Sequence, residues 1–220
     1  MRIILILLVI WDGHDLVRTG LKRLLDDVDG IQVVVEVTSG EQAVEMVRQL
    51  PIDVILMDIN MPGIGGLEAT RKILLKYPVI KIIIVTMNED QVFAQRLLRA
   101  GAAGYLTKGC RITEIAHAIR EVMANKRYIT PQMAQQMALS ELSPDENRSP
   151  FKDLSERELQ VMMMIMDGRK VNEISDKLCL SPKTISTYRQ RLFTKLSIQS
   201  DVELARLVLR YGVMLGQQTE

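Results

Sequence analysis

Four polar residues in the first half of the chain each follow a short apolar run: Asp12, Asp58, Thr86 and Lys108. Apolar runs of this length, rich in β-branched residues, are typical of strands buried on both faces of a parallel sheet. Because the carboxyl ends of parallel strands meet at one edge of a sheet, the four side chains are expected to converge there. Carboxylates, a hydroxyl and an ammonium in one crevice suit phosphoryl transfer.

Each of these groups has a role in such chemistry. Asp58 is the candidate nucleophile, as carboxylates are in enzymes that form an aspartyl phosphate. The side chains of Asp12 and Asp58 and the backbone carbonyl of Asn60 offer hard oxygen ligands for Mg²⁺. Lys108 would neutralise phosphoryl oxygens, and Thr86 would donate a hydrogen bond to one. Taken singly, Asp58 is equally well explained as a helix cap and Lys108 as a solvated loop residue, so only their joint placement favours a site.

The second half of the chain has a local excess of positive charge. The stretch from Lys177 to Lys195 contains five basic residues and no acidic one, in a chain with 28 Lys and Arg against 27 Asp and Glu. A solvated helix face would normally include compensating carboxylates. A basic face on a short helix pair is what contact with a phosphate backbone requires, so the pattern favours DNA binding.

The elements that must position these residues alternate along the chain. Strands are predicted at 4–10, 32–37, 54–57, 82–86 and 104–106, and helices at 15–27, 40–49, 65–76, 90–100 and 112–124. Five strands that alternate with five helices predict an α/β fold with a doubly wound, five-stranded parallel sheet and right-handed crossovers.

After Tyr128 the pattern changes to short helices. Thr130 and Pro131 predict the start of a helix to Leu139, and the polar, proline-bounded stretch 143–150 is typical of a linker. Ser155 begins a capping box, and helices are predicted at 156–166, 171–178, 182–196 and 201–211. We therefore predict a first domain at 1–126, a linker with a short helix at 127–150, and an all-α domain at 151–220.

Composition excludes several classes of protein. A hydrophobic content of 47% supports two cores in 220 residues. The two cysteines, Cys110 and Cys179, lie far apart without ligand-like neighbours, which predicts small core residues in a reducing compartment. The apolar run 3–10 is too short to span a bilayer and lacks a small-residue cleavage site, so a cytoplasmic protein is expected.

Two sets of motifs resemble known domains. Val-Ile-Leu-Met-Asp-Ile-Asn-Met-Pro-Gly at 54–63, with Thr86 and Gly-Tyr-Leu-Thr-Lys at 104–108, resembles the receiver domain of two-component response regulators. Leu-Ser-Glu-Arg-Glu at 154–158 and Leu-Ser-Pro-Lys-Thr-Ile at 180–185 resemble the LuxR-type helix-turn-helix. Together they resemble the NarL/FixJ family, and within it most closely the GacA/UvrY/LetA type, through residues 61–72 and 149–151.

The resemblance implies a flavodoxin-like receiver and a four-helix DNA-binding domain. In the receiver it implies Asp58 as phosphoacceptor, Mg²⁺ as cofactor, and three residues for phosphoryl contact and switching, which are Thr86, Lys108 and Tyr105.

The resemblance also places the second helix of the helix-turn-helix, which begins at Lys183, in the major groove of DNA. Side chains one helical turn apart would face the bases, namely Ser186, Thr187 and Gln190. Five others would mostly contact phosphates, namely Lys183, Thr184, Arg189, Arg191 and Lys195. The last helix is expected to form a dimer contact through Val202, Leu204, Leu207 and Val208.

One segment departs from the family pattern, which has two adjacent acids and then His after the first strand. This chain has Trp11-Asp12-Gly13-His14 there. Either Gly13 replaces the second acid, or the loop holds an insertion and Trp11 replaces the first. In both cases one hard ligand is missing, which predicts weaker Mg²⁺ binding and less efficient phosphorylation.

The predicted function is that of a DNA-binding transcriptional response regulator, not an enzyme. It would be switched at Asp58 by a sensor histidine kinase and would bind double-stranded DNA as a homodimer, with no membrane partner. A phosphoaspartate hydrolase of the haloacid-dehalogenase kind would need a second Asp where Asn60 stands. A phosphorylation-independent regulator, whose receiver serves only for dimerisation, stays open because of Gly13.

Overall fold

The computed structural model describes residues 3–9, 15–59, 61, 64–86, 91–107, 109–142, 150–166 and 168–211. The chain divides into two compact units. One consists of Met1–Thr86 with Arg96–Pro131, and the other of Met87–Gln95 with Gln132–Glu220. Each unit is described by itself below.

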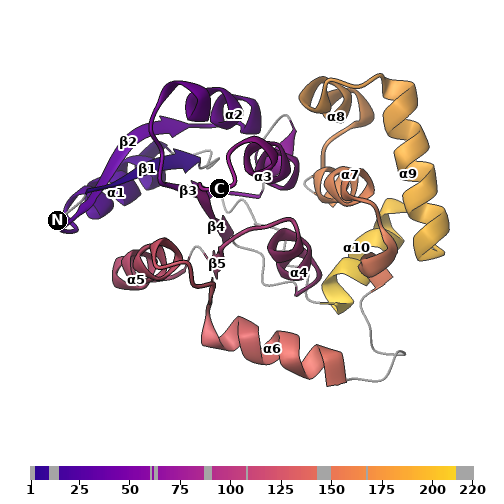
Figure 1. The fold of residues 1–220 in the computed structure, drawn as a ribbon. Helices are drawn as coiled ribbons and strands as arrows, with labels where there is room; N and C mark the ends of the chain where they lie inside the picture. Colours follow the sequence, from indigo (N-terminus) through magenta and orange to yellow (C-terminus); the bar gives the residue numbers. More distant parts are fainter. Residues whose placement is uncertain are drawn as a thin grey trace. The chain divides into compact units, whose positions relative to one another are not determined.

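A parallel sheet organises the first unit (Figure 1). Its strands in spatial order are β2 (Ile31–Val37), β1 (Ile4–Val9), β3 (Val54–Met57), β4 (Lys81–Thr86), β5 (Gly104–Thr107) and β6 (Tyr128–Ile129). The predicted doubly wound parallel sheet is confirmed, with six strands in place of five. The additional strand β6 has two residues, too few to show a hydrophobic period in the sequence.

Strand β6 pairs with the outer side of β5. Gly104 lies opposite Tyr128, and Tyr105 lies opposite Ile129. A Cβ atom on Gly104 would lie 3.2 Å from the Tyr128 carbonyl oxygen, so the absence of a side chain at Gly104 lets the two backbones approach closely.

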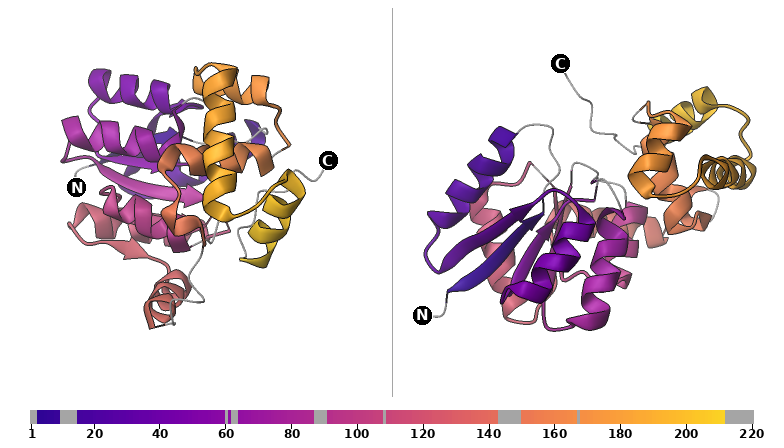
Figure 2. Two further views of the ribbon diagram at one scale, coloured as in Figure 1. Left: turned by 90° about the vertical axis from the view of Figure 1, so that its right-hand side faces the viewer. Right: turned by 90° about the horizontal axis from the view of Figure 1, so that it is seen from above.

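Helices cover both sides of this sheet (Figure 2). They are α1 (Asp15–Asp26), α2 (Gly40–Gln49), α3 (Gly65–Lys76) and α5 (Ile112–Met123), while α4 (Gln91–Arg99) follows β4 in the chain. Leu25 of α1 and Ile119 of α5 share one buried apolar cluster with Leu8, Leu56 and Val85 of the strands. This cluster defines one face of the sheet, so the alternate strand residues belong to the other face.

Short helices make up the second unit. After α6 (Pro131–Leu142) come a 3₁₀ turn, η2 (Pro150–Asp153), and the helices α7 (Glu156–Met166), α8 (Val171–Leu178), α9 (Pro182–Leu196) and α10 (Asp201–Arg210). The four predicted helices after residue 150 are confirmed, whereas η2 was not predicted and α6 extends beyond Leu139. Met162 and Met164 are buried in two neighbouring apolar clusters, as helix-core packing predicts.

Two sequence predictions in this unit are wrong. Leu204 and Val208 of α10 are fully buried in the core of their own unit, so they cannot form the predicted dimer contact. The exposed apolar side chains of α10 are Val202 and Leu209. Cys179 is exposed at the C-cap of α8 with a positive φ of 53°, rather than being a core residue.

Close backbone packing also fixes the start of α3. A Cβ atom on Gly66 would lie 2.4 Å from the carbonyl oxygen of Asp58 and 2.9 Å from the Cα atom of Ile59. Both neighbours are backbone atoms and cannot rotate aside. Gly66 therefore sets how close α3 comes to the end of β3.

We predict that Gly66→Ala lowers the free energy of unfolding by about 1–3 kcal/mol, because the added methyl group forces α3 away from β3. Gly20→Ala in α1 is the matched control. Nothing lies within 4 Å of the Cβ position there, so alanine should stabilise the helix by about 0.5–1 kcal/mol. Urea unfolding of both variants and the wild type measures the difference; equal effects at the two glycines would contradict the packing argument.

Candidate functional sites

Asp58 lies directly after β3 and is almost completely buried, with 1% of its surface exposed. Helix α3 begins at Gly65 with Ile64 as its N-cap, so Asp58 does not cap that helix. The capping explanation for this carboxylate is therefore removed. What remains is a buried carboxylate at the carboxyl end of an interior strand.

The strand register brings two further candidate residues to the same edge. Thr86 ends β4 and pairs with Thr107 at the end of β5, while Ile84 pairs with Tyr105. Thr86 and Tyr105 therefore lie on the same face of the sheet and on adjacent strands. Both side chains are fully buried.

Three predicted residues, Asp12, Asn60 and Lys108, lie outside the described residues. The described part of the chain contains no group of three or more His, Cys, Asp and Glu side chains placed to hold a metal ion. Its contribution to the predicted Mg²⁺ site is the buried carboxylate of Asp58, and a carboxylate is the oxygen ligand that Mg²⁺ prefers. The donor chemistry at this edge thus fits the metal that the sequence predicts.

Helix α9 has a buried side and an exposed side. Ile185, Leu192 and Leu196 are buried, whereas the side chains on the opposite side are exposed, namely Lys183, Ser186, Thr187, Gln190 and Arg191. The helix starts with Ser181 as N-cap and Pro182 in the first turn, residue types that are favoured at these two positions. The exposed side carries no carboxylate, so it remains electropositive.

The predicted base contacts lie on this exposed side. The hydroxyl groups of Ser186 and Thr187 donate to backbone carbonyls one turn back, at 2.9 and 3.0 Å, which leaves their lone pairs available as acceptors. The backbone carbonyl of Gln190 accepts from the Thr194 hydroxyl at 3.0 Å, whereas its side-chain amide makes no hydrogen bond to another described residue. Ser186 and Gln190 line one shallow groove of about 610 Å³ along α9.

Thr184, predicted to contact a phosphate, belongs to the helix cap. Its backbone amide donates to the Ser181 hydroxyl at 3.1 Å, and the two hydroxyl groups lie 2.8 Å apart. Its side chain is half-buried. Thr184 therefore stabilises the start of α9, whether or not it also contacts DNA.

Arg189 is engaged within its own unit. Its guanidinium forms a two-pronged ion pair with Asp201, with Nη2 2.8 Å from Oδ2 and Nε 3.3 Å from Oδ1. The guanidinium also lies 4.8 Å from the centre of the Phe193 ring. These contacts tie α9 to the start of α10 and favour a structural role over a phosphate contact.

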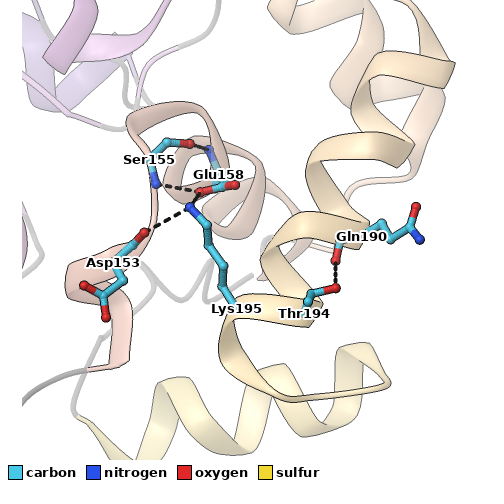
Figure 3. Close-up of polar contacts among 6 residues, drawn as sticks. All are labelled: Asp153, Ser155, Glu158, Gln190, Thr194 and Lys195. Atoms are coloured by element: carbon cyan, nitrogen blue, oxygen red, sulfur yellow. Dashed lines mark hydrogen bonds and ion pairs between the residues drawn. The ribbon is translucent and has the colours of Figure 1, made fainter.

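Lys195 pairs with a buried carboxylate (Figure 3). Its Nζ atom lies 2.7 Å from Oε2 of Glu158 and donates to the Asp153 carbonyl at 3.0 Å. The Glu158 side chain is only 4% exposed. The geometry favours a structural role for Lys195 over the phosphate contact that the sequence suggested.

Glu158 also completes the predicted capping box of α7. Its Oε2 atom accepts from the Ser155 amide at 2.6 Å, and its own amide donates to the Ser155 hydroxyl at 3.3 Å. Burial alone would raise the pKa of Glu158, but hydrogen bonds from Lys195 and Ser155 and the positive charge of Lys195 outweigh it. The pKa of Glu158 therefore lies below its usual value of 4.5.

The sequence identified Glu158 as a cap but missed its ion pair. Lys195 is 37 residues away, so no local pattern links the two side chains. The same is true of Asp201, the partner of Arg189. The one usable signal was a glutamate in the third position of a helix whose other residues are largely apolar.

None of the helices in the described ranges combines the length and apolar content that a membrane-spanning helix requires.

Comparison with known proteins covers both units. Residues 7–120 match the response regulator receiver domain, and residues 152–208 match the bacterial regulatory proteins of the luxR family. Response regulator GacA of Pseudomonas viridiflava is 57% identical over 210 residues, which are 96% of this chain and 98% of the relative. Response regulator UvrY of Escherichia coli K12 is 52% identical over 202 residues, 92% of this chain and 93% of the relative.

Solved structures show the same fold. A LuxR-family two-component response regulator from Aurantimonas sp. SI85-9A1 is 35% identical, with a TM-score of 0.61 over 64% of this chain and all of that one. The RcsB response regulator of Salmonella typhimurium is 23% identical, with a TM-score of 0.75 over 96% of this chain and all of that one.

We predict that Glu158→Gln lowers the free energy of unfolding of the second unit by about 1–3 kcal/mol at pH 7, because glutamine keeps the cap but loses the charge. A lowered carboxyl pKa stabilises the folded state above the usual value of 4.5, and this contribution is lost as pH falls through the folded pKa. The difference between mutant and wild type should therefore shrink below pH 4.5. Chemical unfolding from pH 7 to pH 3.5 measures it.

Glu203→Gln is the matched control for this substitution. Glu203 occupies the equivalent capping position in α10, where it accepts from the Gln199 amide at 2.8 Å, but it is exposed and has no lysine partner among the described residues. Its replacement should cost less than about 0.5 kcal/mol. A pH-independent deficit in Glu158→Gln, or equal deficits in the two mutants, would show that the ion pair does not stabilise this unit.

Proposed function

The chain belongs to the response regulators that join a receiver domain to a LuxR-type DNA-binding domain, and on that premise we propose that Asp58 accepts the phosphoryl group that switches it. It is a DNA-binding regulator of transcription controlled by phosphorylation.

The burial of Asp58 at the carboxyl end of β3, with no helix for it to cap, is the observation that carries the proposal. A carboxylate oxygen of Asp58 attacks the phosphorus of the donor, a phosphohistidine of a sensor kinase. The bond from phosphorus to the donor nitrogen breaks, and its electron pair leaves with the donor. Asp58 becomes an acyl phosphate.

Charge on the transferred group has to be balanced at this edge. We assign Asp12, Asp58 and the Asn60 carbonyl to Mg²⁺, which when bound neutralises part of the phosphoryl charge. The Lys108 ammonium serves the same purpose from the end of β5. One acid of the family pattern is missing from Trp11-Asp12-Gly13, at Gly13 or at Trp11, which weakens the metal site and so lowers the efficiency of phosphorylation.

The switch consists of Thr86 and Tyr105. Thr86 donates a hydrogen bond to the phosphoryl group and moves toward it, which vacates space on its own face of the sheet. Tyr105 lies on that face, one strand away, and changes rotamer to fill the space. Such a pair is a two-state element that a single added charge biases, and it re-forms the receiver surface that pairs with a second copy.

DNA is read by the exposed side of α9. Ser186, Thr187 and Gln190 face base edges, while Lys183 and Arg191 contact phosphates. Lys183 and Arg191 have no carboxylate partner among the described residues, in contrast to Arg189 and Lys195. Paired half-sites require two such helices, so the active form is a homodimer. DNA as the target implies a cytoplasmic location.

A second candidate function is regulation that does not depend on phosphorylation, with a receiver that serves only for dimerisation. Gly13 is the observation that favours it, because one metal ligand of the family is missing. Labelling of the wild type by acetyl phosphate with Mg²⁺ separates the two candidates. A receiver that stays unlabelled at high Mg²⁺ supports the second.

We predict that Asp58→Asn abolishes labelling by acetyl phosphate and leaves the melting temperature close to that of the wild type, because asparagine is nearly isosteric but is not a nucleophile. Asp27→Asn, at an exposed carboxylate after α1, is the control and should be labelled normally. Labelling of Asp58→Asn at the full wild-type level would exclude Asp58 as the acceptor.

We predict that Arg191→Ala weakens binding to all DNA sequences alike and lowers the slope of log affinity against log salt by about one unit. Gln190→Ala should lower the binding free energy by about 1–3 kcal/mol on the cognate site and by little on random DNA. A side-chain amide distinguishes one base from another only when it is aligned with the edge of that base. Fluorescence anisotropy over a salt series measures both.

Arg48→Ala is the control for these two substitutions, since Arg48 is an exposed arginine of α2 and should leave the salt slope unchanged. Equal losses for Gln190→Ala on cognate and random DNA would mean that α9 lies differently in the groove.

A further inference from the structure

We propose that Glu41 is a positioning residue for the metal-dependent phosphorylation of Asp58. The backbone amide of Ile64 donates a hydrogen bond to Oε1 of Glu41 at 2.8 Å. Glu41 is in the first turn of α2, and Ile64 is the N-cap of α3, 23 residues further along the chain. The bond therefore joins two helices at the edge of the sheet that carries Asp58.

The two helix starts are in close contact at this point. A Cβ atom on Gly40 would lie 2.8 Å from Cγ1 of Ile64, 3.0 Å from Cβ of Ala69 and 3.1 Å from the carbonyl oxygen of Gly65. Glycine is thus required next to Glu41 for α2 to approach α3. This packing leaves Glu41 only a short distance to span, so its carboxylate reaches the Ile64 amide in an ordinary hydrogen-bond geometry.

Ile64 closes the loop that begins at Asp58. The amides of Met61 and Gly66 both donate to the Ile59 carbonyl, at 3.0 and 3.3 Å, so the two ends of the loop are held together. Met61 is 4% exposed. Ile64 lies between Met61 and Gly66 in the chain, at the N-cap of α3. Because isoleucine has no side-chain oxygen that could cap the helix, the acceptor for the Ile64 amide comes from another helix.

The position of this tether has a chemical consequence. Asn60, whose backbone carbonyl we assign to Mg²⁺, lies outside the described residues and precedes Ile64 by four positions in the sequence. A carbonyl ligand is useful only if the backbone that carries it is held in place, because Mg²⁺ requires near-ideal octahedral geometry. Glu41 does not touch the metal; it holds the loop that does. Because one acid of the family pattern is missing, at Gly13 or at Trp11, each remaining ligand contributes more to Mg²⁺ binding.

The inference rests on the proposed phosphorylation of Asp58, and its test uses the full chain with three substitutions. Glu41→Ala removes the acceptor. Glu41→Gln removes the charge but keeps an oxygen that accepts from the Ile64 amide. Glu45→Ala, one turn further along α2, removes an exposed glutamate whose partners, Arg48 and Gln49, belong to the same helix.

Two measurements apply to each variant: Mg²⁺ binding, followed by the amide signals of residues 58–66 in a ¹H–¹⁵N NMR titration, and the Mg²⁺ dependence of labelling by acetyl phosphate. Glu41→Ala should raise the half-saturating Mg²⁺ concentration about fivefold in both, the factor expected for one ordinary hydrogen bond. Glu41→Gln and Glu45→Ala should remain close to the wild type.

Each other outcome overturns part of the argument. Wild-type Mg²⁺ binding in Glu41→Ala, even with a lower melting temperature, assigns Glu41 a merely structural role and overturns the inference. Equal losses in Glu41→Gln and Glu41→Ala overturn the hydrogen-bond mechanism, because charge alone would then matter. If the wild type itself is not labelled, the proposed function fails, and the NMR titration still decides whether Glu41 acts on the metal site.

Discussion

Parallel pairing of β1, β3, β4 and β5 forces the carboxyl ends of four strands onto one edge of the sheet, which is the edge where we propose that phosphorylation takes place. The strand bodies are apolar and fully buried, as at Ile55, Leu56 and Ile83, so their burial holds the register firmly. Asp58 directly follows β3 and Thr86 is the last residue of β4, so the backbone positions of both are fixed by the strands. Beyond the end of β3, hydrogen bonds from the Met61 and Gly66 amides to the Ile59 carbonyl, and the close approach of Gly66 to Asp58 and Ile59, fix the described backbone.

The basic residues of α9 divide by the side of the helix on which they lie. Lys195 forms an ion pair with Glu158, and Arg189 forms one with Asp201. These pairs fix α9 against α7 and α10. Lys183 and Arg191 lie on the exposed side and have no carboxylate partner among the described residues. A count of basic residues in the sequence therefore overstates the number of phosphates that one domain can neutralise. The number that matters for affinity is set by which side chains the fold has already used.

Elements set by local interactions could be predicted from the sequence, whereas contacts between distant residues could not. The bounds of β3, α2, α3 and α9 agree with the structure because apolar period and helix caps are local signals. Asp58 could be singled out because it directly follows a strand that the local apolar pattern predicts, and functional residues of parallel sheets lie at the carboxyl ends of strands. The ion pairs of α9 were missed because their partners are distant in the chain. For α10, an apolar face at Leu204 and Val208 was assigned to a second copy, although the core of its own unit already uses it.

The short strand β6 changes what counts as the end of the receiver. Tyr128 and Ile129 cover the outer side of β5, and the Tyr128 amide donates to the Ala103 carbonyl at 3.0 Å. A receiver fragment cut at residue 126 would leave β5 as a bare edge, with unpaired backbone donors and acceptors that can template another chain. An unpaired edge of this kind favours edge-to-edge association that does not depend on a phosphoryl group. Dimers of such a fragment would result from the exposed edge of β5 and would give no information about how phosphorylation changes the full-length protein.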